Sequence, residues 1–496
     1  MPNIIKKILI CVLTAAMVFP VFTQTSYAKK EELSLPYLEL PVTVETITVG
    51  LRSGSSALYE AKLQNRVGSG YNFGYFDITR SFRTLGYTFA NAISVRGDSG
   101  FNLNEETYVG SWHILLNYYY SDYDNAKSSA TSVGGFPAYI NGQYRVMIGA
   151  YADKESADKA IQKGGYTGSA YTGSSSSLLI AETNTANLLF MYDNPGSHKL
   201  AIFPLTDGQD EETWFSGYYY RGAFEFTKKD NGAINVTNYV DLESYVGGVL
   251  PYEMNGAWPL EALKSQAVCA RTYAINNLNS YARNGYDVRS DTYSQVYRGI
   301  TESTDTTVEA AEVTSCEYAR YKGAICKVYY MSSDGGTTES GENTFKQRRD
   351  YLSAVKDPFE SDIEHFNETW EIRYTPFAIT SKLNSRGYEM AEVCDIVPTV
   401  SDSGNVIALK FTDINGREAE IFNVDCYKIL GLNSLNYTVS KTTDEENEKT
   451  ITFVFDGHGW GHNCGLSQWG SYSMAEYHGK NYNEIIDYYF SGAYVK

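Results

Sequence analysis

Positive charge is scarce in this sequence, and its scarcity excludes several classes of binding partner. Lysine and arginine number 41 against 59 acidic residues, so the net charge is −18 at pH 7. A nucleic-acid-binding protein needs a basic face for phosphates, and docking on anionic lipid or teichoic acid through charge needs one as well. The composition therefore predicts no nucleic-acid partner. A neutral sugar polymer is compatible with it, and the 43 tyrosines supply flat, amphipathic contact surface.

Cysteine is also sparse, and its spacing argues against common zinc motifs. None of the seven cysteines forms a Cys-x-x-Cys pair, so a zinc ribbon is not expected. Six cysteines follow residue 28, an even number that permits disulfides in an exported protein without fixing their pairing. Cys316 and Cys326 flank a predicted hairpin turn at 321–323 and are the pair we favour, although facing positions alone do not establish disulfide geometry.

Long apolar runs are confined to the first 28 residues. Lys6 and Lys7 precede an apolar stretch over 8–22, and Ser26-Tyr27-Ala28 offers small residues for cleavage. This is the pattern of a secretory signal peptide, with a retained membrane anchor as the alternative. No later stretch is apolar enough to span a bilayer. Both interpretations predict an extracytoplasmic protein, either secreted or membrane-anchored.

An internal repeat begins near residue 112. Two similar segments start at Tyr120 and Tyr151, an offset of 31 residues, and Gly134 matches Gly165 at the same offset. Each copy has an apolar strand, a short helix rich in alanine and charge, and another extended run, which predicts a tandem β-α-β unit of the ferredoxin-like kind. The second copy, YRVMIGAYADKESADKAI, resembles the SPOR domain, a peptidoglycan-binding module. A generic small α+β insert is the alternative.

The segments on either side of the repeat are predicted to form one larger domain. Strand patterns occupy 46–52 before the repeat, and 220–226 and 233–240 after it, so the repeat is interpreted as an insertion at a surface loop. We expect an α+β fold with mixed sheets. The predicted parts are the signal peptide at 1–28, the first part of the main domain at 29–110, the insert at 112–190 and the main domain at 205–496.

Glu253 is the first candidate for acid–base chemistry. It follows a strand-like run that ends at Leu250-Pro251, and Trp258-Pro259 opens a long helix with proline at its permissive start. Apolar residues at three- or four-residue steps over 260–281 predict one buried stripe on that helix. A carboxylate beside apolar and aromatic groups has its charged form disfavoured, as a general acid near neutral pH requires. A solvated acid near a helix N-terminus is the alternative.

Three further segments combine glycine with polar and aromatic residues, at 291–297, 329–339 and 456–470. Each alone could be a turn, but with the Glu253 segment they resemble the SpoIID/LytB domain in order and spacing. The resemblance covers 235–496 well and 45–110 and 205–235 loosely. Its most specific pieces are GGVLPYEMNGAWPLEALKSQAVCARTYA, SQVYRG, YYMSSDGGTTES, DYLSAVKDP and GHGWGHNCGLSQWGSYSMAEYHGKNYNEIIDYYFSG.

The resemblance implies a groove-forming domain whose long helix follows the catalytic turn, with Glu253 as the catalytic acid. It implies an extracytoplasmic, cell-wall-associated peptidoglycan lytic transglycosylase that cleaves the MurNAc–GlcNAc bond in sporulation or wall remodelling. Its partners would be glycan strands and a cell-wall amidase or other sporulation wall-degrading proteins. The alternative is a non-enzymatic amidase enhancer of the LytB type. Residues matching other motif positions, expected to line or support the glycan groove, are Arg271, Gln295, Tyr297, Ser333, Gly336, Thr338, His462 and Gln468.

One departure from the family bears on metals. Some clostridial relatives carry Cys-x3-His-Cys just before Gln-Val-Tyr, and the matching positions here are Arg289, Tyr293 and Ser294. Arginine repels a cation, and tyrosine and serine are poor zinc ligands, so no zinc is expected there. We expect packing by Tyr286, Tyr293 and Tyr297 to hold the loop instead.

Two rival chemistries involve the histidines of the glycine-rich loop. His458 and His462 stand four residues apart but lack a helix and an adjacent third ligand. A Cys464–His462 nucleophile pair consists of neighbours in sequence without demonstrated geometry. The sequence therefore predicts activity without a metal or another cofactor.

Overall fold

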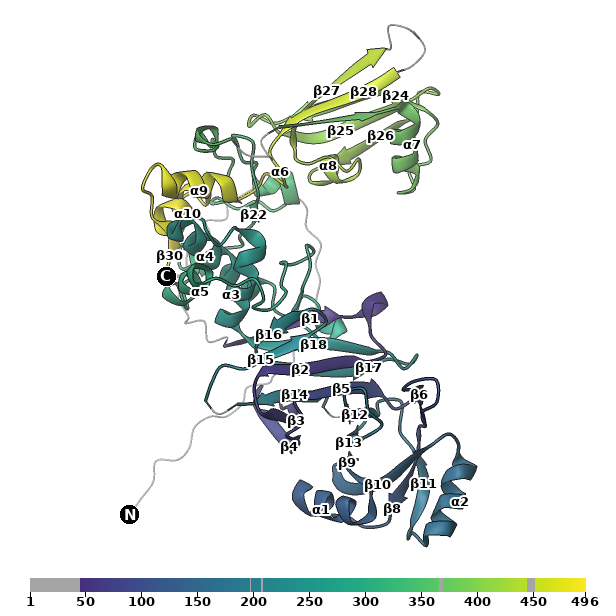
Figure 1. Ribbon diagram of the computed structural model, residues 1–496. Coiled ribbons are helices and arrows are strands. Elements are labelled where there is room, and N and C mark those ends of the chain that lie inside the picture. The colour runs from purple at the N-terminus through teal and green to yellow at the C-terminus, as the bar shows by residue number, and fades with distance from the viewer. Residues whose placement is uncertain (1–44, 197, 207, 365–368, 444–450) are drawn as a thin grey trace, which may run out of the picture. The chain divides into compact units, whose positions relative to one another are not determined.

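The computed structural model describes residues 45–196, 198–206, 208–364, 369–443 and 451–496. The predicted signal peptide lies outside the described residues. Within those residues, none of the helices is long and apolar enough to cross a membrane. The fold is α+β with several mixed sheets, as the sequence predicts (Figure 1).

One seven-stranded sheet joins residues from both sides of the repeat. Strand β1 lies before the repeat and β18 after it, and they pair antiparallel with Thr46 opposite Asp241. The two flanking segments therefore share one sheet. Its order is β19-β1-β18-β17-β14-β3-β4. The strands are β1 (Thr46–Arg52), β3 (Gly70–Phe76), β4 (Phe82–Thr88), β14 (Leu200–Leu205), β17 (Ala223–Lys228), β18 (Ile234–Asp241) and β19 (Val288–Arg289).

A ten-stranded sheet has the order β11-β8-β10-β9-β13-β12-β5-β2-β15-β16. One buried core, which includes Val49 of β1 and Leu63 of β2, draws side chains from both large sheets. The strands are β2 (Ala61–Val67), β5 (Ala92–Gly97), β8 (Trp112–Leu116), β9 (Phe136–Ile140), β10 (Gln143–Tyr151), β11 (Gly168–Thr172), β12 (Leu178–Glu182), β13 (Leu188–Asp193), β15 (Glu212–Phe215) and β16 (Tyr218–Tyr220).

The repeat folds into two β-α-β halves with matching caps. Asp122 caps α1 (Tyr123–Val133) and Asp153 caps α2 (Lys154–Gly164), each accepting a backbone N–H in the first turn. Both helices end at a glycine with φ near 65°, Gly134 and Gly165, a conformation that glycine adopts without strain. The strand order β11-β8-β10-β9, antiparallel throughout, is of the ferredoxin-like kind.

The predicted insert boundary at residue 190 falls inside strand β13. Strand β13 pairs with β9 of the repeat and also with β12, which pairs with β5 of the main domain. The β-α-β repeat itself spans 112–172, and its sheet continues into the larger one instead of forming a separate module. Hydrophobic patterning marks where strands lie but not which neighbour an edge strand takes. That choice is made by tertiary packing.

Three helices follow the seven-stranded sheet (Figure 1): α3 (Leu242–Glu253), α4 (Leu260–Asn276) and α5 (Asp305–Val313). The strand predicted before Pro251 is wrong, because this run is the body of α3. Asp241 caps the helix by accepting the N–H groups of Glu243 and Ser244, each at 2.9 Å. Pro251 cannot donate to the carbonyl of Gly247, and the Ser303 hydroxyl donates to that oxygen instead, at 3.3 Å. Burial of the whole run overrides its strand propensity.

A second small unit, which the sequence analysis did not separate from the main domain, occupies 369–458. It has its own buried core, including Leu409 and Phe455. Two three-stranded sheets, β23-β28-β27 and β24-β25-β26, form it. Its elements are β23 (Thr369–Tyr374), α7 (Pro376–Asn384), β24 (Val393–Val400), β25 (Val406–Asp413), β26 (Glu418–Phe422), α8 (Asp425–Lys428), β27 (Asn436–Thr443) and β28 (Ile451–His458).

The remaining elements bring the C-terminal motif to the helices. A parallel bridge pairs Tyr330 of β22 with Leu466 of β29, directly before α9. The elements are β22 (Tyr330–Met331), α6 (Gly341–Phe345), β29 (Leu466–Ser467), α9 (Gln468–Glu476), α10 (Tyr482–Tyr489) and a small sheet of β20 (Ala319–Tyr321), β21 (Ala324–Ile325) and β30 (Tyr494–Val495). A separate two-stranded hairpin consists of β6 (Phe101–Asn102) and β7 (Tyr108–Val109).

Candidate functional site

Glu253 is the last residue of α3, at the turn that leads into α4. Its Oε1 accepts the backbone N–H of Val296 at 3.4 Å. Burial raises the pKa of the Glu253 carboxyl to about 7, while hydrogen bonds from Val296, Tyr330 and Gln468 lower it by less. Among the described residues, no charged side chain contributes to this shift. The carboxyl is therefore poised to exchange a proton near neutral pH.

Neutral donors surround this carboxyl. The Tyr245 hydroxyl donates to Gln295 Oε1 at 3.0 Å, and Gln295 Nε2 donates to the Tyr330 hydroxyl at 2.9 Å. Burial, with a smaller effect of the Glu253 charge, raises the pKa of Tyr245 and of Tyr330 well above the ordinary tyrosine value. Both phenols therefore stay protonated, and Tyr330, which hydrogen-bonds to Glu253, can stabilise its carboxylate without competing for its proton.

Aromatic packing fixes the turn after Glu253 against α9. The Trp258 ring lies 4.6 Å from the Trp469 ring and 5.1 Å from the Tyr472 ring, measured between centroids. The backbone N–H of Trp469 donates to the carbonyl of Ser332 at 3.0 Å. Since α9 begins at Gln468, these contacts hold the Gln468 amide beside Glu253.

The structure brings one predicted groove residue, Gln468, to the Glu253 carboxyl, and a second, Gln295, to Tyr330, which itself hydrogen-bonds to that carboxyl. Tyr297 is 1% exposed, and its hydroxyl donates to Asn238 Oδ1 at 2.8 Å. Arg271 is fully buried, and its Nε donates to Glu243 Oε1 at 2.9 Å. The buried contacts of Tyr297 and Arg271 support the fold around the turn, and a role for either residue at the glycan stays a prediction.

Three more predicted residues lie in a loop after β22, and their side chains serve local contacts. Ser333 Oγ donates to Glu360 Oε2 at 2.7 Å. Gly336 has φ +98°, which favours glycine, and its N–H donates to Asp334 Oδ1 at 2.7 Å. Thr338 Oγ1 accepts the N–H of Val355 at 2.8 Å. A role for these three residues at the glycan stays a prediction.

His462 packs its ring against Phe345 and Tyr329, with centroids 5.1 and 5.9 Å apart. Burial, with a smaller effect of Lys428, lowers the pKa of His462 to about 4, so the imidazole is neutral at physiological pH. Its Nδ1 accepts the N–H of Cys464 at 3.2 Å. Burial raises the pKa of the Cys464 thiol, and a thiol kept protonated in this way is a poor nucleophile.

The loop before Gln295 is held only in part as predicted, since Tyr286 and Tyr297 are buried but the third tyrosine is not. Tyr293 is 74% exposed and contributes no core packing. Arg289 Nε instead donates to Asp291 Oδ1 at 3.0 Å, and its guanidinium lies 4.6 Å from the centre of the Tyr293 ring. Ser294 Oγ accepts the N–H of Arg289 at 3.1 Å. An ion pair and a turn hydrogen bond therefore occupy the positions of the clostridial metal ligands.

The predicted Cys316–Cys326 disulfide is wrong for this structure. Both cysteines are free, with Cys316 exposed and Cys326 fully buried. Cys316 has φ +62°, and its N–H donates to Glu243 Oε1 at 3.2 Å. The hairpin between the cysteines forms, but its pairing does not turn the Cys316 side chain inward.

Two pockets lie near opposite ends of α3. The larger, about 590 Å³, lies at the N-terminal end and includes Asp241 and Glu243 in an acid-rich lining. The smaller, about 230 Å³, lies on the Glu253 side, because the Arg298 guanidinium that lines it is 5.8 Å from the Tyr252 ring. Its lining consists of Leu51, Arg52, Phe215, Ser216, Tyr218, Tyr220, Ser290, Tyr297 and Arg298.

The α3–α4–α5 region matches the family model described as stage II sporulation protein, SpoIID, over residues 230–321. An uncharacterized protein of Brachyspira hyodysenteriae is 34% identical over 56% of this chain and 72% of its own length. Stage II sporulation protein D of Bacillus subtilis is 28% identical over 52% of this chain and 74% of its own length. The amidase enhancer of Bacillus subtilis is 26% identical over 49% of this chain but 39% of its own length.

The ordered motifs, the family-model match and these relatives agree. The chain therefore belongs to the SpoIID/LytB family. The matched segment, 230–321, holds Glu253 and Gln295, whereas Tyr330 and Gln468 lie beyond it. Tyr330 was missed as an individual site residue because its motif marks a strand end, and 77 residues of sequence separate it from Glu253.

Proposed function

We propose that this protein is an extracytoplasmic peptidoglycan lytic transglycosylase with Glu253 as its acid and base. The observation that carries the proposal is a lone carboxyl whose pKa, raised by burial to about 7, lets it hold a proton and give it up near neutral pH. The family membership and the relatives named for sporulation and amidase enhancement support an action on the cell wall.

One carboxyl suffices for this reaction because the nucleophile belongs to the substrate. Protonated Glu253 donates its proton to the glycosidic oxygen as the bond from that oxygen to C1 of MurNAc breaks. The 6-hydroxyl of the same MurNAc then bonds to C1, and its proton passes to the Glu253 carboxylate. The products are a 1,6-anhydro end and a free GlcNAc end, and the carboxyl is protonated again. An ordinary glycosidase needs a second carboxylate, and none contributes to the environment of Glu253 among the described residues.

The small pocket supports a substrate with a free carboxylate next to the scissile bond. Arg52 donates to Ser216 Oγ at 2.5 Å, and Arg298 donates to the Tyr218 hydroxyl, so both face neutral partners. Neither arginine takes part in an ion pair among the described residues. Denuded strands carry a free lactyl carboxylate on MurNAc, which two arginines can bind. We expect denuded strands to be preferred, and Arg298→Ala to raise KM more for denuded than for peptide-bearing strands.

Digestion of purified peptidoglycan tests the proposed activity. Wild-type protein should release muropeptides with 1,6-anhydro ends, identified by mass, and Glu253→Gln should not. Glu302→Gln is the matched control, since Glu302 is exposed but close enough for its charge to act on Tyr252. Retention of full activity by Glu253→Gln would exclude Glu253 as the acid.

The likeness to a protein named amidase enhancer supports a second candidate function. In that case the same site binds glycan without cleaving it, and the chain presents strands to a cell-wall amidase. No anhydro product would then form, but adding the protein would accelerate stem-peptide release by an amidase. Glu253→Gln would leave this acceleration intact, which separates the two candidates.

The repeat at 112–172 is proposed to bind glycan strands, on the basis of its SPOR resemblance. Excision of 112–190 would remove β12 and β13 from the ten-stranded sheet, so the better deletion replaces 112–172 with a short linker. The shortened protein should pellet less with sacculi while retaining its activity on soluble strands. Unchanged pelleting would assign the repeat another role.

A further inference from the structure

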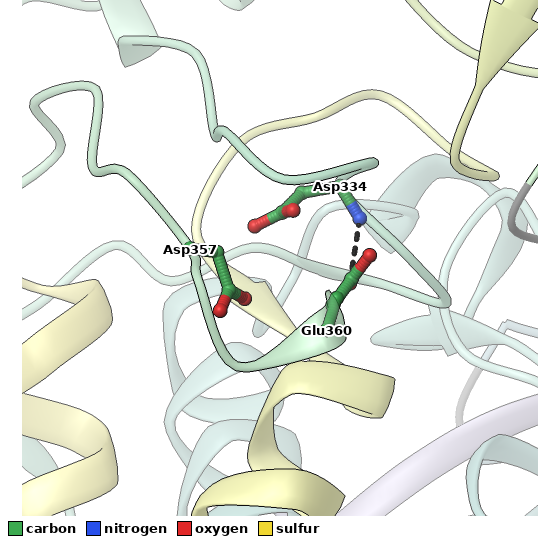
Figure 2. A group of neighbouring side chains, drawn as sticks. All are labelled: Asp334, Asp357 and Glu360. Carbon is green, nitrogen blue, oxygen red and sulfur yellow. Dashed lines mark hydrogen bonds between the residues drawn. The ribbon is translucent and has the colours of Figure 1, made fainter. Parts of the chain in front are cut away.

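Three buried carboxylates converge at a second place in the molecule. Asp334 follows β22, and Asp357 and Glu360 lie in a loop and a 3₁₀ turn (Glu360–Asp362) further along the chain. The three residues are 0%, 2% and 5% exposed. One oxygen of each lies within 4.8 Å of the corresponding oxygens of the other two. Figure 2 shows the Asp334 carboxylate directed toward Asp357, with Glu360 on the adjacent side.

Neutral donors satisfy only part of this cluster. Glu360 accepts hydrogen bonds from Ser333 Oγ at 2.7 Å, the Asp334 N–H at 2.9 Å and Ser467 Oγ. Asp357 accepts one from the Tyr489 hydroxyl at 2.5 Å and one from the Phe359 N–H at 2.9 Å. Asp334 Oδ1 accepts the N–H of Gly336, but Asp334 Oδ2 is buried and has no hydrogen-bond partner.

No positive charge balances the cluster. None of the ion pairs among the described residues includes Asp334, Asp357 or Glu360. Burying an ionised carboxylate is costly unless it is paired or coordinates a metal, and carboxylates this close repel one another. The cluster therefore requires either a cation or a proton shared between two of its members.

We propose that Asp334, Asp357 and Glu360 bind a Ca²⁺ ion, to which Asp334 Oδ2 contributes a ligand. Calcium takes oxygen ligands at about 2.3–2.6 Å, so two ligands on opposite sides of one ion lie about 4.6–5.2 Å apart. The three oxygens lie within 4.8 Å of one another, close enough to share one ion of this kind. Mg²⁺ usually keeps several waters and is seldom held by protein carboxylates alone, so a set of three carboxylates favours Ca²⁺.

The cluster contacts α9 at its first turn. Ser467, which caps α9, donates to Glu360, and a Cβ at Gly470 would overlap the Tyr489 hydroxyl and the Asp357 carboxylate. Gln468, beside Glu253, lies between these two contacts. A bound ion would therefore hold both loops against the start of α9 and position Gln468. Histidine and cysteine motifs gave no sign of this site, because its ligands are carboxylates that lie apart in the sequence. The expectation that activity needs no metal stays a prediction, and a calcium requirement for activity would contradict it.

Calcium titration of the chelator-treated full-length chain tests the site. With CaCl₂ at 100 times its Kd, the Tm should rise by about 3 °C, and MgCl₂ should have less effect. Asp334→Asn should abolish the calcium-dependent rise. Asp362→Asn is the matched control because this exposed acid lies two residues after Glu360, and it should leave the rise unchanged.

Terbium luminescence provides a measurement that does not depend on Tm. Tb³⁺ occupies Ca²⁺ sites and is excited by nearby tyrosine, and Tyr489 contacts Asp357 directly. The wild-type protein should sensitise Tb³⁺, CaCl₂ should displace it, and Asp334→Asn should show little signal. A calcium-independent Tm together with equal terbium signals from wild type and Asp334→Asn would overturn the proposal and leave a shared proton as the explanation. Neither readout depends on glycan cleavage, so failure of the proposed function would not affect it.

Discussion

The molecule buries acids in two different ways, at Glu253 and at the cluster of Asp334, Asp357 and Glu360. Glu253 is a lone carboxyl among neutral tyrosines and glutamines, and burial is the main cause of its raised pKa. In the cluster, repulsion between carboxylates adds to burial, raising the pKa of Asp334 strongly and that of Asp357 to about 6. A lone buried acid can exchange its proton with a substrate, whereas a cluster is better suited to retaining a proton or a cation.

A third acid, Glu243, has a charged partner. Glu243 pairs with the buried Arg271 guanidinium, whose Nη2 also donates to the carbonyl of Ala311 at 3.0 Å. Here the partner carries a full positive charge, and the ion pair serves the fold. The three sites together indicate that the partner of a buried acid, more than burial itself, decides between catalysis, ion binding and support. Each prediction below changes one partner or one acid.

The largest expected effect is loss of activity in Glu253→Gln. The amide has the shape of the acid but no proton to donate, so kcat should fall by about 10²–10⁴, measured as the rate of anhydro-muropeptide release. Because Glu253 must begin protonated, kcat/KM of the wild type should decline as pH rises above about 7. An unchanged profile up to pH 9 would contradict the assigned pKa.

Removal of the paired acid should damage the fold most. Glu243→Gln leaves the fully buried Arg271 without its counter-charge. Breaking a buried pair in this way costs about 3–5 kcal/mol, measured as the free energy of unfolding in urea. Glu312→Gln is the control, because Glu312 lines the same pocket but takes part in no ion pair among the described residues. Equal stabilities of the two variants would show that the pair contributes little.

Glu253→Gln should have the opposite effect on stability. A folded pKa of about 7, above the ordinary value of 4.5, means that the folded protein holds this proton more tightly than the unfolded chain. Stability from this group is present below pH 4.5 and is lost as pH rises through 7. Glutamine cannot be deprotonated, so the variant does not lose this stability as pH rises. Above pH 7 its free energy of unfolding should therefore exceed that of the wild type by up to about 3 kcal/mol. A variant less stable than the wild type at pH 8 would refute this sign.

The smallest expected effect concerns the contact between the cluster and α9. Gly470→Ala forces a methyl group against Tyr489 and Asp357, and overpacking of this kind costs about 1–3 kcal/mol. Calcium affinity should fall as well, because Asp357 must move. Gly247→Ala is the matched control for a glycine replaced inside a helix, since a Cβ at Gly247 of α3 would meet only Ala311 Cβ, at 3.9 Å. If Gly470→Ala binds calcium as tightly as the wild type, calcium binding by the cluster does not depend on its contact with α9.

Several features were determined by the sequence alone. Strand β1 has the predicted bounds, and helix α4 begins where Trp258-Pro259 indicated, because alternation, periodicity and proline placement act over a few residues. The 31-residue repeat indicated a short helix in each copy, and these are α1 and α2. The order of the motifs was enough to indicate the SpoIID/LytB family.

Only the tertiary structure decided the rest. The Val246–Leu250 run became helix because it is buried on all sides, which local propensity does not report. Tyr330 and Gln468 hydrogen-bond to Glu253 although they are far from it in the sequence. Asp334 likewise hydrogen-bonds to Glu360, 26 residues away. Such contacts depend on how strands and helices pack, and packing is a property of the whole chain. The acids were visible in the sequence, but their partners emerged only when the chain was folded.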